Sequence, residues 1–203
     1  MPAQATVRPA RPRKLLIFDL NVGYGGHPSA KVANVAFTLM GQKTGAFETE
    51  VSNDPAVFQR ESLKRFDAVF FNNTVGNCFT NAELRQNLLE FVTGGGGLLG
   101  VHGTSVAFTR WPGAIEDWPE FGVMLGARGA NHKASDEHVW IKLDDRDHPL
   151  NRVFGGPFAT CAVLRSCQAA PTSTVSAGDE GARSAAGAAA PGPAGRGAGR
   201  AGG

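Results

Sequence analysis

The strongest constraint on the fold of this chain is a set of short, uninterrupted apolar runs that end at polar or glycine-containing loops. Lys14–Asp19 (KLLIFD), Asp67–Phe71 (DAVFF) and Leu98–Val101 (LLGV) carry no charged residue in their interior. Such runs are typical of strands buried on both faces, because helices cover each face of a parallel sheet. Phe47–Val51 is a further candidate strand, and His138–Leu143 (HVWIKL), whose residues alternate, is a candidate edge strand.

Segments with helical periodicity lie between these strands. The first is predicted to begin at Ser29 and end at Gly41, and the second to begin at Thr80, with Glu83 completing a capping box. The apolar residues of the first helix are Val32, Val35, Ala36 and Leu39. Strands that alternate with helices at this spacing indicate an α/β fold with a parallel sheet covered on both faces.

Composition sets the ends of the chain apart from its middle. Of the 203 residues, 42% are apolar and 19% are charged, as in ordinary globular proteins. However, 24 of the 35 residues from 169 to 203 are Ala, Gly or Pro, and such a stretch cannot offset its ordering entropy by burying apolar surface. Residues 15–156 hold 12 basic and 16 acidic side chains, so nucleic acid is disfavoured as a partner.

The sequence also bears on the compartment. It has no apolar run of the roughly 18 residues that a membrane span needs, and the apolar stretch 15–18 is too short for a signal peptide. Cys78, Cys161 and Cys167 lack the spacing of a zinc site, and without a secretion signal cysteines stay reduced. We therefore expect a cytoplasmic protein with no membrane partner.

Three loops are the expected location of the functional site. In a doubly wound sheet, ligands bind outside the carboxyl ends of the strands, near the point where the strand order reverses. Residues 20–28, 72–79 and 102–110 each follow a predicted strand, so all three loops should meet at that edge.

Residues 100–104 (Gly-Val-His-Gly-Thr), which we call the elbow, have the form of a nucleophile elbow, where a strand turns sharply into a helix and exposes one side chain. The exposed residue is His102 instead of Ser or Cys, which disfavours a serine-hydrolase or glutaminase mechanism. A helix amino terminus beside His102 would favour the neutral ring, which can act as a general base, a hydrogen-bond donor or a metal ligand. The alternative is a histidine that fills the turn and bonds only to the backbone.

Two further histidines could converge on His102. His27 ends the first glycine-rich loop, and His132 follows Gly126. Three histidines that leave one position open for water form catalytic zinc sites, so a divalent metal such as zinc is the cofactor that this interpretation suggests. None of the three has the local spacing of metal ligands, and the alternative is three polar residues that bind a ligand or water.

Trp111 and Trp118 lie in an insert just after the elbow. Aromatic faces beside a polar pocket suit stacking on a sugar ring. Alternatively, the two rings pack the insert onto the sheet.

Together these segments resemble the trehalose-utilisation, or ThuA-like, family. The resemblance runs from about Lys14 to Phe154, and its most specific part is the combination of a GGGxxGxH segment with a downstream DxHP. The segments that carry it are KLLIFD with the glycine loop that ends in His27, DAVFFNNTVGN, FVTGGGGLLGVHGTS, the Trp-Pro insert with Phe121-Gly122 and Leu125-Gly126, His132, and Asp147-His148-Pro149.

The resemblance implies a three-layer α/β sandwich with a mostly parallel, doubly wound sheet, similar to flavodoxin-like proteins and class I glutamine amidotransferases. It also implies a role in carbohydrate utilisation, on trehalose, another disaccharide or a keto-sugar that a partner sugar dehydrogenase has oxidised. In this interpretation His102 is the catalytic residue. The residues expected to bind the sugar are His27, Asn72, Asn73, Thr74, Trp111, Trp118 and His132.

After Phe158 the composition changes, and the chain passes into an Ala-, Gly- and Arg-rich sequence instead of the acidic, aromatic continuation of family members. We therefore expect a disordered basic arm over residues 1–13 and a ThuA-like domain over residues 14–158 that lacks its late elements. Residues 159–203 are expected to form a disordered tail, as a shifted reading frame would produce.

Two other functions fit the same residues. A non-catalytic sugar-binding or vestigial module would bind its ligand without turnover. A metal-dependent hydrolase would need a stoichiometric metal ion. The sequence does not separate the non-catalytic module from a protein that processes the sugar.

Overall fold

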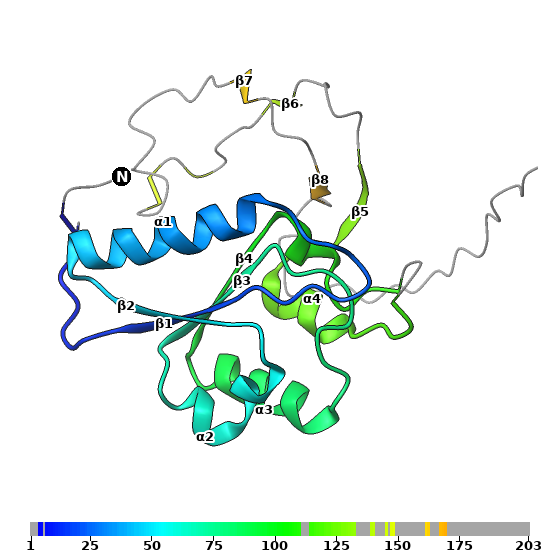
Figure 1. The fold of residues 1–203 in the computed structure, drawn as a ribbon, viewed down its shortest axis with the longest axis horizontal. Coiled ribbons are helices and arrows are strands. Elements are labelled where there is room, and N and C mark those ends of the chain that lie inside the picture. The colour runs from blue at the N-terminus through cyan, green and yellow to red at the C-terminus, as the bar shows by residue number, and fades with distance from the viewer. Residues whose placement is uncertain are drawn as a thin grey trace, which may run out of the picture. The chain divides into compact units, whose positions relative to one another are not determined.

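A four-stranded parallel sheet organises the computed structural model of this protein (Figure 1). Its strands are β1 (Lys14–Phe18), β2 (Glu48–Ser52), β3 (Ala68–Asn72) and β4 (Gly97–Val101), in the order β2-β1-β3-β4. This order matches the first four strands of flavodoxin-like folds, in which the chain adds strands first on one side of β1 and then on the other. The strand order therefore reverses between β1 and β3, and the parallel sheet expected from the sequence is confirmed.

The chain divides into two compact units, residues 1–172 and residues 173–203, and all described residues belong to the first. The structure describes residues 4–5, 7–110, 114–132, 139–140, 145, 147–148, 161–162 and 167–169.

Side chains alternate across the sheet, and those of β1 and β3 are largely buried on both of its faces. Leu15 and Ile17 of β1 face helix α1 (Ser29–Thr44), whereas Leu16 and Phe18 point to the opposite side. Helices pack on both faces, which makes the three-layer α/β sandwich that was expected (Figure 1). The second helical layer consists of η1 (Pro55–Phe58), α2 (Arg60–Leu63), α3 (Ala82–Thr93) and α4 (Pro119–Leu125).

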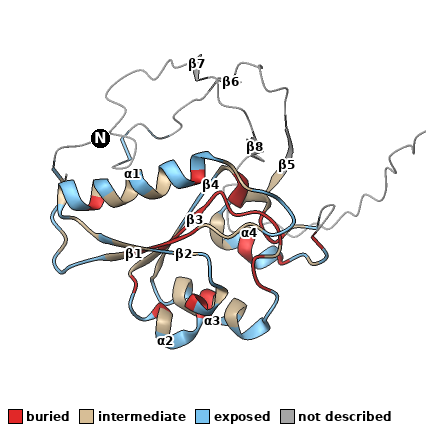
Figure 2. Cartoon of the chain, in the orientation of Figure 1, coloured by how far each residue is buried: buried red, intermediate tan, exposed pale blue. Residues whose placement is uncertain are grey.

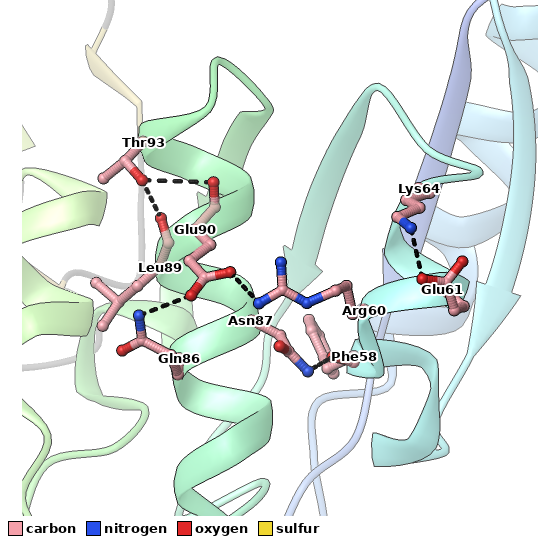
Figure 3. Close-up of polar contacts among 9 residues, drawn as sticks. All are labelled: Phe58, Arg60, Glu61, Lys64, Gln86, Asn87, Leu89, Glu90 and Thr93. Carbon is pink, nitrogen blue, oxygen red and sulfur yellow. Dashed lines mark hydrogen bonds and ion pairs between the residues drawn. The ribbon is translucent and has the colours of Figure 1, made fainter.

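The second helical layer is held by an aromatic core and by polar contacts between its helices. Phe58 packs edge-on against Phe18, with ring centroids 4.8 Å apart. Figure 3 shows how side chains join α3 to the two preceding helices: Asn87 Nδ2 donates to the Phe58 carbonyl of η1 over 3.2 Å, and Arg60 of α2 pairs with Glu90. Burial is greatest along β1 and β3 and in the loop after β3 (Figure 2).

The face that α1 turns to the sheet differs from the predicted one. Phe37 packs on Phe70 of β3, with ring centroids 4.4 Å apart, whereas Val32 and Val35 are 69% and 59% exposed. The helix is oriented this way because Asn34, on the sheet side, is hydrogen-bonded to polar side chains that follow β1 and end β3. An amphipathic pattern counts apolar residues only, so it misses a helix that is held partly by polar groups.

Two helix boundaries also differ from the predicted ones. Helix α1 runs through Gly41 and ends at Gly45, whose left-handed φ of 64° suits a C-cap. The N-cap of α3 is Asn81, not Thr80, because the Asn81 Oδ1 accepts the backbone N–H of Glu83 over 2.7 Å.

Two short antiparallel pairs complete the described elements: β5 (Gly129–His132) with β8 (Cys167–Ala169), and β6 (Val139–Trp140) with β7 (Cys161–Ala162). Most of the tail predicted over residues 159–203 lies outside the described residues.

In the predicted basic arm, residues 4–5 and 7–13 are described. There Arg11 and Arg13 form ion pairs with Asp67. No helix among the described residues is long and apolar enough to span a membrane.

Candidate functional site

The loops that follow β1 and β3 pack tightly against each other at the carboxyl edge of the sheet. Asn21 and Val75 form an isolated parallel bridge, and the Val22 N–H donates to the Val75 carbonyl over 3.0 Å. Gly76 has a φ of 82°, and a Cβ at this position would stand 2.1 Å from the Val22 carbonyl oxygen. Only glycine fits this approach, so the two loops meet as the sequence predicts.

His102 stands directly after β4 in a strained conformation. Its φ is 48°, which is uncommon for a residue other than glycine. Residues 102–106 form a short 3₁₀ turn (η2) and not the longer helix that was expected, so no extended helix amino terminus lies beside the ring. Gly103 packs closely here, because a Cβ would stand 2.9 Å from the Val75 side chain. A single tight turn therefore follows β4 at His102.

Asn73 holds the ring of His102 from the neighbouring strand end. Its Oδ1 lies 2.9 Å from His102 Nδ1 and accepts the backbone N–H of Gly103 over 3.4 Å. Asn73 is buried and also has a positive φ, of 55°. The sequence places Asn73 among the sugar-binding residues, but its oxygen is occupied by protein donors.

His27 lies against His102, as the predicted convergence of loops requires. The two rings meet edge to face, with centroids 4.6 Å apart. Tyr24, which the sequence analysis does not assign to the site, extends the group: its ring centroid is 5.4 Å from that of His27, and its hydroxyl is 3.4 Å from His27 Nε2. Tyr24 is 41% exposed. We call Tyr24, His27, Asn73 and His102 the histidine site.

Asn72 and Thr74 are built into the core. Both are fully buried. Asn72 Nδ2 donates to the Ala30 carbonyl over 2.8 Å and to Asn34 over 2.7 Å, while the Thr74 hydroxyl donates to Thr104 over 3.2 Å. Their polar groups therefore join the loop after β3 to α1 and to the elbow, which does not support the expected contacts with sugar hydroxyls.

The structure describes one of the two tryptophans that were predicted to stack on a sugar ring. Trp118 is buried and packs edge-on against Phe108, with ring centroids 5.1 Å apart. This arrangement favours the alternative in which the ring packs the insert onto the sheet, and it leaves no exposed face for a sugar. Trp111 lies outside the described residues.

The three-histidine metal site is only partly described. His132 is the last residue of β5, and its side chain is outside the described part of the structure. Among the described residues, no three His, Cys, Asp or Glu side chains are grouped so that they could hold a metal ion. His27 and His102 would supply two of the three predicted nitrogen ligands.

Cys78 lies in the loop after β3, but its environment does not favour a nucleophilic thiolate. It is 4% exposed, and burial raises the pKa of its thiol to about 12. The thiolate that nucleophilic catalysis needs is therefore absent at neutral pH.

A large cavity lies elsewhere. A space of about 990 Å³ near the amino-terminal ends of β1 and β2 is lined by residues such as Arg8, Arg13, Gln42 and Glu48. The histidine site is the stronger candidate for a functional site, because strained backbone, paired imidazoles and the switch point of the sheet coincide there.

Comparison with known proteins decides the family. A sequence model of the ThuA family, described as trehalose utilisation, matches residues 14–162, about three quarters of the chain. The chain belongs to the ThuA family. No curated protein matches it.

A solved ThuA-like protein from Bacteroides uniformis has a similar fold. It shares 20% sequence identity with this chain and superimposes with a TM-score of 0.56. The match covers 75% of this ThuA-family chain but only 58% of the Bacteroides protein. At this identity the comparison supports the α/β fold alone.

Proposed function

We propose that this ThuA-family protein binds and processes a sugar at the histidine site, namely trehalose, another disaccharide or a keto form of one. The observation that carries the proposal is His102, which keeps a strained φ of 48° while its ring is held by Asn73 and packed on His27. Backbone strain of this kind costs on the order of 1–3 kcal/mol and persists mainly at functional sites.

The groups at the site suit the chemistry of a polyhydroxylated substrate. His102 is partly exposed and acts as the general base on a sugar hydroxyl or a water molecule. The His27 ring contacts the His102 ring, and the Tyr24 hydroxyl lies beside the His27 ring. Both side chains supply further hydrogen-bonding groups. The exposed ring of Tyr24 takes the stacking role that the sequence assigns to the tryptophans.

A keto-sugar substrate would have to be supplied by an oxidation. The described residues include no nucleotide-binding glycine motif, so we assign that step to a separate sugar dehydrogenase of the same compartment. Carbohydrate utilisation in the cytoplasm is the setting that we propose.

The test measures ligand-dependent thermal unfolding together with product formation. Trehalose and a keto-disaccharide are each added to the full chain, to His102→Gln and to a matched surface variant, Glu61→Gln on α2. We expect one sugar to stabilise the wild type and Glu61→Gln alike, with the stabilisation and any turnover lost in His102→Gln. Equal stabilisation of all three proteins would remove His102 from the site. Binding without turnover would identify a non-catalytic sugar-binding module.

The contact between two imidazoles favours one alternative function, a metal-dependent hydrolase. Rings of His27 and His102 with centroids 4.6 Å apart can turn nitrogens toward one ion. Titration of the chain with Zn²⁺ would show one equivalent bound with micromolar or tighter affinity, and its loss in both His27→Gln and His102→Gln. Failure to bind stoichiometric zinc would exclude this alternative.

A further inference from the structure

Asn73 and His102 occupy matching positions at the ends of two neighbouring strands. The last paired residues of β3 and β4 are Asn72 and Val101, so Asn73 and His102 are the next residues on each strand. Both leave the sheet with a left-handed backbone, with φ of 55° and 48°. This shared departure brings the Asn73 amide and the His102 ring together, with 2.9 Å between Oδ1 and Nδ1.

A backbone group fixes which atom of the amide faces the ring. The Gly103 N–H can only donate, and it points to the same Asn73 Oδ1 over 3.4 Å. With the amide turned over, its NH₂ group would face this N–H and leave it buried without an acceptor, which is costly. The oxygen therefore faces the ring, and the ring nitrogen beside it has to be the donor.

We infer that Asn73 is a positioning residue that holds neutral His102 in the Nδ1–H tautomer, so that Nε2 is the nitrogen that accepts a proton or another ligand. The inference deepens the proposed function and rests on it for its chemical meaning. An amide carries no charge, so it orients the ring without stabilising the imidazolium form, unlike the carboxylate of a Ser-His-Asp triad. It also assigns Asn73 to the ring instead of to sugar hydroxyls.

Three variants distinguish the loss of the Asn73 acceptor oxygen from a change in the backbone conformation at residue 73. Asn73→Gly removes the acceptor and keeps the left-handed conformation accessible. Asn73→Asp retains an acceptor oxygen in a residue that also tolerates positive φ. Thr74→Val is the matched control. It removes a buried hydroxyl from the next residue of the loop, and that hydroxyl is hydrogen-bonded to Thr104.

The readout is the protonation state of each ring nitrogen in long-range ¹H–¹⁵N correlation spectra. Spectra are recorded without sugar, at a pH well above the usual histidine range, and His102→Gln assigns the His102 signals. We expect Nδ1–H in the wild type, Asn73→Asp and Thr74→Val. In Asn73→Gly the ratio should shift toward Nε2–H, the form that a free side chain favours in water, on the order of 3- to 10-fold.

Two results would overturn the inference: a wild-type His102 in the Nε2–H form, or an Asn73→Gly tautomer ratio equal to that of the wild type. The wild-type spectrum decides the first even if Asn73→Gly does not fold. Because no sugar is present, a chain that shows the Nδ1–H form and then fails to bind any sugar refutes the proposed function and leaves the role of Asn73 standing.

Discussion

Replacement of Gly76 by alanine tests how closely the loops after β1 and β3 pack. Two costs contribute. A φ of 82° is left-handed, and a residue with a Cβ loses roughly 1–2 kcal/mol there. About 0.4–1 kcal/mol is recovered because alanine makes the unfolded chain less flexible. The conformational part of the change is therefore a loss of about 0.5–1 kcal/mol.

The second cost is steric. The new Cβ would stand 2.1 Å from the Val22 carbonyl oxygen, which belongs to backbone and cannot turn aside as a side chain would. Backbone shifts forced by added methyl groups cost about 1–3 kcal/mol, and the hydrogen bond from Val22 to Val75 would be disturbed. The total expected for Gly76→Ala is a loss of about 1.5–4 kcal/mol in the free energy of unfolding.

The matched control is Gly45→Ala. Gly45 also has a positive φ, of 64°, but a Cβ there would have nothing within 4 Å. Urea denaturation of both variants separates conformation from packing, and each kcal/mol lowers the melting temperature by about 2–4 °C in a protein of this size. If Gly76→Ala and Gly45→Ala lose the same stability, the close approach of the two loops is wrong.

Three further variants or conditions test the core, the ion pairs and the buried thiol. Phe58→Ala, in the centre of the aromatic core, is expected to cost about 3–5 kcal/mol in urea denaturation, and a loss below about 1 kcal/mol would contradict its burial. Burial raises the pKa of Asp67, but hydrogen bonds from Arg13 and from the Lys14 backbone outweigh this and hold the pKa below its usual value. The stability that this carboxylate contributes is therefore present above its unfolded-state pKa and is lost as the pH falls through its folded-state pKa. In urea denaturation at decreasing pH, Asp67→Asn should therefore lose less stability than the wild type. Equal acid sensitivity of the two proteins would refute this. Cys78 should resist iodoacetamide at pH 8 until urea unfolds the chain, as mass spectrometry of its peptide would show, and rapid labelling of the native protein would contradict its raised pKa.

The central strands β1 and β3 could be predicted from the sequence because strands buried on both faces leave uninterrupted apolar runs, whereas Leu99 and Val101 of the apolar β4 are 43% and 40% exposed. The predicted bounds of all four strands lie within one residue of the observed ones. The meeting of His27 with His102 could be predicted as well, because parallel strands bring their following loops to one edge.

Other features depend on contacts that no local pattern records. The orientation of α1 is set partly by hydrogen bonds from Asn34 and Asn72, so its apolar stripe is exposed. The ring of Trp118 resembles a sugar platform in sequence, but the fold uses it to pack the core. One signal in the sequence could have assigned Tyr24 to the histidine site: it is a single aromatic residue in a glycine-rich loop that follows a strand.

The most direct test of the sugar site follows the histidine ring signals while trehalose or a keto-disaccharide is titrated into the full chain. We predict that one of these sugars shifts the ring resonances of His27 and His102 along a single saturable curve, while those of the exposed His148 stay unchanged. No saturable shift with either sugar, or a shift at His148 alone, would contradict a sugar site built around His102.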